Sequence, residues 1–134
     1  MRKIITILIP VLFIFSGAKA QESKKKEPAE PELSQHEIEI IQSSGYAYAE
    51  AYCRYEFSKL LVAKNPEDNM LLNKMNDDKK VFSDLLDQRQ EKYSKQPIFT
   101  IYMDAYSDGL KKLHSCVRLS KLKEQNKLEE NSEN

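Results

Sequence analysis

The two cysteines are the most informative of the residues in this 134-residue sequence that could carry out chemistry. Cys53 and Cys116 form an even count, and in an oxidising compartment two thiols pair unless their geometry prevents it. A redox-active pair would instead have close C-x-x-C spacing and an electropositive surrounding that stabilises the thiolate. The sequence therefore predicts a structural disulfide between Cys53 and Cys116.

The other candidates for metal binding or catalysis are scattered along the chain. His36 and His114 are the only histidines, and no histidine or cysteine pair has the spacing of a zinc site, which needs three or four converging ligands. A serine or cysteine nucleophile lacks a base that is itself oriented by an acid. Asp84, Asp87 and Glu91 repeat at helical spacing, which is typical of a solvated helix face. We therefore expect no metal, no cofactor, no catalytic residue and no enzymatic activity.

Four tyrosines within ten residues are the most unusual local feature of the sequence. Tyr46 shares the helical face of Cys53, whereas Tyr48, Tyr52 and Tyr55 form a second ridge. Exposed tyrosines are favoured anchors of protein interfaces, which makes Tyr48, Tyr52 and Tyr55 candidates for contact with a partner. The alternative is that this ridge packs against the next helix of the protein, because each helix of a three-helix bundle faces two neighbours.

The first twenty residues have the organisation of a secretory signal peptide. A basic pair at positions 2–3 precedes an apolar run at 4–15, and residues 18–20 match the A-x-A cleavage pattern. The apolar run is too short to cross a bilayer core of about 30 Å, which requires about 20 helical residues. We expect cleavage after residue 20, no transmembrane span in the mature chain, and a periplasmic or extracellular location.

The charge balance of the mature chain argues against a nucleic-acid partner. Cleavage of the signal removes three of the 21 basic residues, which leaves 18 against 21 acidic residues, a formal charge of −3. Binding to nucleic acid requires a basic face that displaces counterions from the phosphates, whereas here positive and negative residues alternate along the chain. We expect another protein to be the partner.

Polar segments flank a central domain predicted at 34–124. Residues 21–33 are expected to be a disordered linker, because 21–32 contain no apolar side chain larger than alanine or proline. Nothing there can be buried to offset the entropy of ordering the chain. Residues 125–134 are equally polar and are expected to form a disordered tail.

The central domain is predicted to be all-α, because its only glycines and prolines are two of each. Residues 34–37, Ser-Gln-His-Glu, form a capping box, in which the serine and glutamate side chains bond to the first free backbone amides of a helix. Asn65 and Pro66 end that helix and begin the next, and Pro97 opens a third. The expected helices are 34–64, 66–94 and 97–123. Residues 76–78 compete for backbone hydrogen bonds and could split the second helix, so the sequence is compatible with a three- or four-helix bundle.

Helical geometry supports the predicted disulfide between the first and third of these helices. Cys53 lies 19 residues after Ser34, and Cys116 lies 19 residues after Pro97, so each stands about 28 Å along its helix. In an up-down-up bundle these two helices run parallel, so residues at the same height along them, such as the two cysteines, lie side by side. A bond that closes a loop of about 64 residues stabilises a protein by about 4 kcal/mol.

The layout resembles the periplasmic immunity proteins of the type VI secretion amidase group. The matching features are the signal peptide, Cys53 in a helix rich in tyrosine and alanine, and Cys116 at the start of Cys-Val-Arg-Leu-Ser-Lys-Leu (116–122). This resemblance implies a small exported helical protein that binds and blocks a peptidoglycan-cleaving toxin. The tyrosine-histidine-serine sequence that follows the cysteine in that family is absent, so the resemblance assigns no partner-contacting residue.

These patterns predict a small exported helical module that binds another protein. A periplasmic inhibitor or immunity protein of a cell-wall hydrolase is the specific form that the resemblance implies. The alternative is a structural or envelope-associated protein without catalytic activity, which would bind lipid, peptidoglycan or its own copies through the basic segment at 24–26.

Overall fold

The computed structural model of this chain describes residues 32–133, which contain four α-helices and no strand. The chain divides at Ser34, and the four helices all belong to the unit that follows it. They are α1 (Gln35–Lys64), α2 (Asn69–Lys92), α3 (Ile98–Lys112) and α4 (His114–Glu133). The predicted all-α fold is confirmed. The predicted signal peptide at 1–20 lies outside the described residues, as does nearly all of the linker at 21–33.

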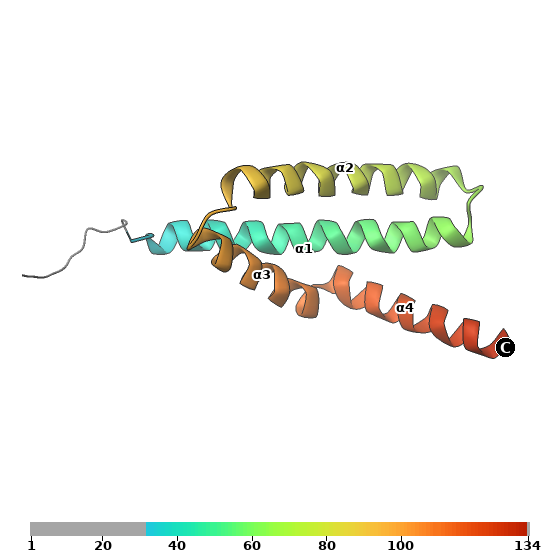
Figure 1. Cartoon of the computed structure of the whole chain (residues 1–134). Helices are drawn as coiled ribbons and strands as arrows, with labels where there is room; N and C mark the ends of the chain where they lie inside the picture. Colours follow the sequence, from blue (N-terminus) through green and yellow to red (C-terminus); the bar gives the residue numbers. More distant parts are fainter. Residues whose placement is uncertain (1–31, 134) are drawn as a thin grey trace, which may run out of the picture. The chain divides into compact units, whose positions relative to one another are not determined.

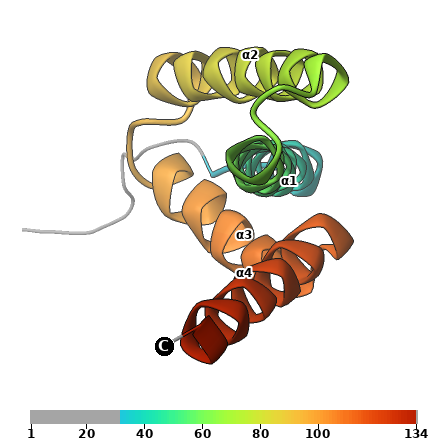
Figure 2. The ribbon, with the colours of Figure 1, turned by 90° about the vertical axis from the view of Figure 1, so that its right-hand side faces the viewer.

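Helix α1 is the central element of the helical unit. It packs against α2, α3 and α4, and Figure 2 shows α2 on one side of α1 and the α3–α4 pair on the other. Along the chain, α2 runs antiparallel to α1, and α3 and α4 return in the direction of α1 (Figure 1). The backbones of α2 and α4 do not approach each other within the described residues, so one face of α1 stays open between them.

Two glycines allow α1 and α3 to pack closely. A Cβ on Gly45 would overlap the backbone carbonyl oxygen of Tyr102 and lie 2.9 Å from the Cβ of Ala105. A Cβ on Gly109 would lie 2.9 Å from the Cβ of Ala49. The seam between the two helices therefore has room for a hydrogen atom at these two positions and not for a methyl group.

The fourth helix arises from a break at Leu113 and not from one at 76–78. Leu113 is extended, with φ −66° and ψ 141°, and it separates α3 from α4 where the sequence predicted one helix from 97 to 123. Leu113 packs against the cluster formed by the disulfide and Leu119, so the change in direction keeps its side chain in the core. Helix α2 continues through 76–78, because the Asp78 carboxylate accepts from side chains and leaves the backbone hydrogen bonds intact.

Helix α4 also extends beyond the end expected at residue 123. It continues to Glu133, through the part of the chain for which the sequence predicted a disordered tail. Lys64, at the end of α1, forms an ion pair of 2.8 Å with Glu129, and Asn126 is half-buried. The ion pair connects the polar end of α4 to α1, an interaction that the composition of the segment alone does not predict.

Candidate functional site

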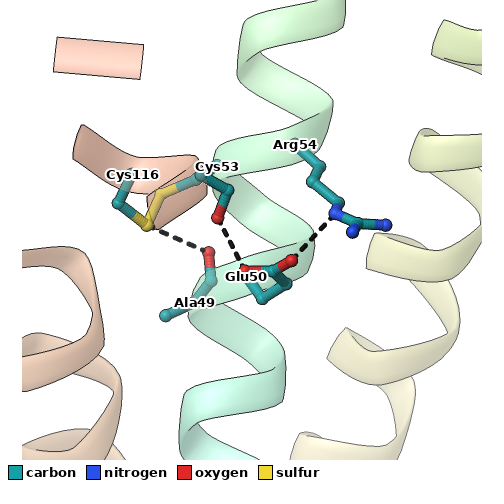
Figure 3. The surroundings of a disulfide bond; sticks show 6 residues. Ala49, Glu50, Cys53, Arg54 and Cys116 are labelled. Carbon is teal, nitrogen blue, oxygen red and sulfur yellow. Dashed lines mark hydrogen bonds and ion pairs between the residues drawn. A yellow bond between two sulfur atoms is a disulfide. The ribbon is translucent and has the colours of Figure 1, made fainter. Parts of the chain in front are cut away.

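The predicted disulfide between Cys53 and Cys116 is confirmed. The S–S distance is 2.07 Å and the two Cα atoms are 5.0 Å apart. Cys53 is 1% exposed and Cys116 2% exposed, and Leu119 completes their buried cluster. Figure 3 shows the bond beside α1, with the Cys116 sulfur 3.6 Å from the carbonyl oxygen of Ala49. A sulfur pair buried this deeply is withheld from dissolved thiols, which suits a structural bond.

The three tyrosines that the sequence offered as partner contacts all pack against Phe82 of α2. Tyr48 is only 6% exposed, and its ring lies 5.4 Å from that of Phe82 on α2 and 5.1 Å from that of Tyr106 on α3. Tyr52 and Tyr55 are half-buried, each with its ring centroid 5.8 Å from that of Phe82. Tyr48 therefore fits the core-packing alternative, whereas Tyr52 and Tyr55 contact Phe82 and keep part of their surface exposed.

The two histidines do not come together. His36 is exposed in the first turn of α1, whereas His114 is exposed at the first position of α4. Among residues 32–133, no group of three or more histidine, cysteine, aspartate or glutamate side chains is arranged to hold a metal ion.

The open face of α1 is the floor of a groove with a volume of about 450 Å³. Its two walls come from α2 and α4, whose backbones do not approach each other within the described residues. The lining of the groove includes Arg54, Phe57, Leu61, Leu71, Lys74 and Arg118, and His114 lies at its α4 wall.

The α1 residues of the groove form one helical stripe. Glu50, Arg54, Phe57, Ser58 and Leu61 are separated by four, three, one and three residues, which places them on the same face. This stripe does not form an apolar pattern in the sequence, because it mixes charged and apolar side chains. The spacing itself was the signal that could have revealed it.

Both acids in the groove are already bonded to neighbouring side chains. Asp78 is 8% exposed, and it accepts a hydrogen bond of 2.5 Å from Ser58 and two of 3.0 Å from Lys74. Glu50 accepts one of 2.7 Å from Ser115 and pairs with the Nε atom of Arg54 at 2.9 Å (Figure 3). The carboxylates therefore hold α1 to α2 and to α4, and their negative charge is largely compensated inside the protein.

The cations of the groove retain free donors. The Arg118 guanidinium lies 4.5 Å from the centroid of the Phe57 ring, and among the described residues no carboxylate forms an ion pair with it. Arg54 uses Nε for its ion pair, and 58% of its side chain is exposed. The groove thus has an apolar floor and guanidinium donors at its edge, an arrangement suited to binding a group that is both apolar and anionic.

A smaller hollow between α1 and α3 is lined in part by Tyr46 and Asp108, whose hydrogen bond ties the two helices together. The Tyr46 hydroxyl donates to Asp108 at 2.5 Å, and Lys112 pairs with the same carboxylate at 3.1 Å. The hydrogen bond to Asp108 raises the pKa of Tyr46, and that bond together with the one from Lys112 lowers the pKa of Asp108.

Comparisons with known proteins do not assign the chain to a family, since no family model, curated protein or solved structure matches it. None of the helices formed by residues 32–133 is both long enough and apolar enough to cross a membrane. The groove is therefore the candidate site on the strength of its geometry and charge.

Proposed function

We propose that this chain is an exported protein-binding module, and that its partner is a cell-wall hydrolase which it inhibits. The single observation that carries the proposal is the open groove, with apolar side chains and two exposed guanidinium groups in its lining, on a helical scaffold held by a disulfide. A scaffold that is already ordered loses little conformational entropy on binding, which favours affinity.

Two further observations support the location and the partner class. A buried disulfide is compatible with an oxidising compartment, and the sequence has a signal-peptide pattern at 1–20. The sequence resemblance to periplasmic immunity proteins supports a hydrolase as the partner, because an inhibitor of that kind requires a stable complementary surface and no chemistry of its own.

The experiment is affinity capture with the full-length chain, tagged at its C-terminus and exported in its own cells. Mass spectrometry of the purified chain should show a mature N-terminus at Gln21 and an intact disulfide. A hydrolase should copurify in a fixed stoichiometry, and adding the tagged chain should inhibit its release of fragments from purified peptidoglycan.

The control is a tagged exported protein of similar size that is unrelated to this chain, captured from the same cells. Recovery of this chain alone would contradict the proposal. Sedimentation of the chain with the envelope fraction, without a captured protein, would favour the envelope-associated alternative. A captured hydrolase whose activity is unchanged would keep protein binding and reject inhibition.

A further inference from the structure

We infer that the groove between α2 and α4 binds an acidic helical segment of the partner protein, with the apolar side chains of that segment inserted against α1. This inference rests on the proposed function, because it identifies the surface and the partner chemistry through which that function would operate. Three properties of the groove carry it: its dimensions, its apolar floor and the distribution of its unpaired charge.

The dimensions suit one face of a short helix. The α1 stripe extends from Glu50 to Leu61, which corresponds to about 17 Å, or about three helical turns, at 1.5 Å per residue. The volume of about 450 Å³ is too small for a whole helix of this length, whose diameter with side chains is about 10–12 Å. The groove therefore has room for the side chains of one helical face, while the body of the bound helix stays outside.

The floor supplies the apolar part of the contact. Phe57 and Leu61 of α1 and Leu71 of α2 line the groove, and each remains half-buried in the isolated chain. Covering them would remove apolar surface from water at about 25 cal/mol per Å². Apolar side chains that recur every three or four residues along a helix match this floor, as they do in other complexes of a helix with a groove.

The unpaired charge identifies the sign of the partner. Arg54 pairs with Glu50 and Lys74 pairs with Asp78, so these four charges balance. Arg118 rests on the Phe57 ring and has no ion pair among the described residues, while Arg54 keeps its terminal nitrogens for a further contact. A carboxylate on the incoming helix can accept two parallel hydrogen bonds from a guanidinium group. A basic helix would place like charges against Arg54 and Arg118 and would be rejected.

The same charges favour an acidic protein segment over a polyanion. Binding to a nucleic acid or a strongly anionic surface requires an extended array of cations that displaces many counterions. Here Glu50 and Asp78 lie among Arg54, Lys74 and Arg118 in the same groove. The arrangement suits a partner that has a few carboxylates beside apolar side chains.

The test uses the full mature chain and three labelled 14-residue helical peptides of matched length. The first has leucine on one face and glutamate on both flanks, the second has lysine in place of glutamate, and the third has serine in place of leucine. Fluorescence anisotropy measures affinity, and amide chemical shifts locate the contact. We expect the first peptide to bind most tightly and to shift amides of α1, α2 and α4 around the groove.

Charge reversal in the chain supplies the matched controls. The Arg54→Glu/Arg118→Glu variant should weaken the binding of the first peptide by about tenfold or more, because it replaces two charge-assisted contacts with repulsion. The Lys80→Glu/Lys111→Glu variant changes the net charge equally at exposed positions away from the groove, and its affinity should stay within about twofold of the parent. Circular dichroism melting should show that both variants fold.

Several results would overturn the inference. In the peptide measurements these are equal binding of the lysine peptide, unchanged affinity in the Arg54→Glu/Arg118→Glu variant, and amide shifts that map away from the groove. Tighter binding to anionic vesicles than to any peptide would also contradict it, as would occupation of the groove by a second copy in sedimentation experiments.

The captured hydrolase separates this inference from the proposed function. If it stays bound to the Arg54→Glu/Arg118→Glu variant, the groove assignment fails and the proposed function stands. If it is lost from that variant and kept by Lys80→Glu/Lys111→Glu, both are supported. If no protein is captured at all, the proposed function fails, and the peptide measurements still decide whether the groove prefers acidic segments.

Discussion

Removing the Cys53–Cys116 bond should lower the stability of this protein by about 4 kcal/mol. The two cysteines are separated by 63 positions, and closing a loop of that length removes from the unfolded chain an entropy that corresponds to about 4 kcal/mol at 25 °C. Small domains are stable by only about 5–15 kcal/mol in total, so the bond accounts for a large share of the whole. Replacing both cysteines by alanine also deletes two buried sulfur atoms, which adds a smaller packing cost.

The assay is thermal unfolding of the mature chain, followed by circular dichroism at 222 nm. For a domain of about 100 residues, 1 kcal/mol corresponds to about 4–8 °C, so the Cys53→Ala/Cys116→Ala variant should melt about 20 °C below the oxidised parent. The parent treated with a phosphine reductant keeps both sulfur atoms and should show most of the same shift. The reductant should leave the melting temperature of the double variant unchanged.

The loss should also be uneven along the chain. Helix α4 contacts α1 through Cys116, Leu119 and the ion pair of Lys64 with Glu129, whereas the α1–α2 pair has its own aromatic contacts. Hydrogen exchange in the double variant should therefore accelerate first in α4 and least in the middle of α1. A melting shift below about 5 °C, or an equal acceleration in all four helices, would refute the view that the bond anchors α4 to the rest of the protein.

Three further predictions test the packing between α1 and α3. Gly45→Ala should lower the free energy of unfolding by at least about 1 kcal/mol, measured as a lower urea midpoint. The alanine Cβ would overlap the Tyr102 carbonyl oxygen, and this overpacking outweighs the helical preference of alanine. Tyr102→Phe should raise the free energy of unfolding by about 1 kcal/mol, seen as a higher urea midpoint with the m-value unchanged, because the buried Tyr102 hydroxyl has no hydrogen-bond partner among the described residues. Asp108→Asn should destabilise the protein at pH 7 and progressively less as the pH falls below about 4, since the bond from Tyr46 lowers the pKa of Asp108 and its stabilisation is lost when the carboxylate is protonated. Equal losses for Asp108→Asn at pH 7 and pH 2.5 in urea unfolding would contradict this assignment.

The parts of the fold that depend on local chemistry were predictable from the sequence. Helix α1 begins directly after Ser34, where the capping box placed its start, and it ends at Lys64, before Asn65 and Pro66. The pairing of Cys53 with Cys116 was also predicted, from the even cysteine count and from helices that run in the same direction. The argument from equal heights assumed one helix from 97 to 123, whereas the break at Leu113 places Cys116 on α4, so the bond joins α1 to the fourth helix and not to the third. The start and end of α1 are determined by residues close in sequence.

The break at Leu113 was not predictable in the same way. Leucine favours helix, and no proline or glycine occupies position 113, so the local sequence predicts continuity. The extended conformation there is compatible with tertiary packing, since Leu113 reaches the disulfide cluster while α4 changes direction. The continuity of α2 has a similar origin, because Asp78 finds its partner Ser58 on α1, twenty positions earlier in the chain.

The candidate site was missed for a related physical reason. The buried face of a helix shows in the sequence as an apolar stripe, whereas the open face of α1 mixes Glu50 and Arg54 with Phe57 and Leu61. The tyrosine ridge was apparent from composition, but whether a ridge is buried depends on which neighbours flank the helix. Since α1 packs against the other three helices, most of its apolar surface is internal and the mixed stripe is the face left open.

Stability and the candidate groove depend on the same bond. Cys116 is in the first turn of α4, two residues before Arg118, so the disulfide that ties α4 to α1 also holds the guanidinium group over the Phe57 ring. Releasing α4 would remove one wall of the groove and separate Arg118 from the apolar floor, even at temperatures where α1 and α2 stay folded. The affinity of the reduced protein for an acidic peptide should therefore fall before its helical content does, which links the redox state of a buried bond to the shape of an exposed surface.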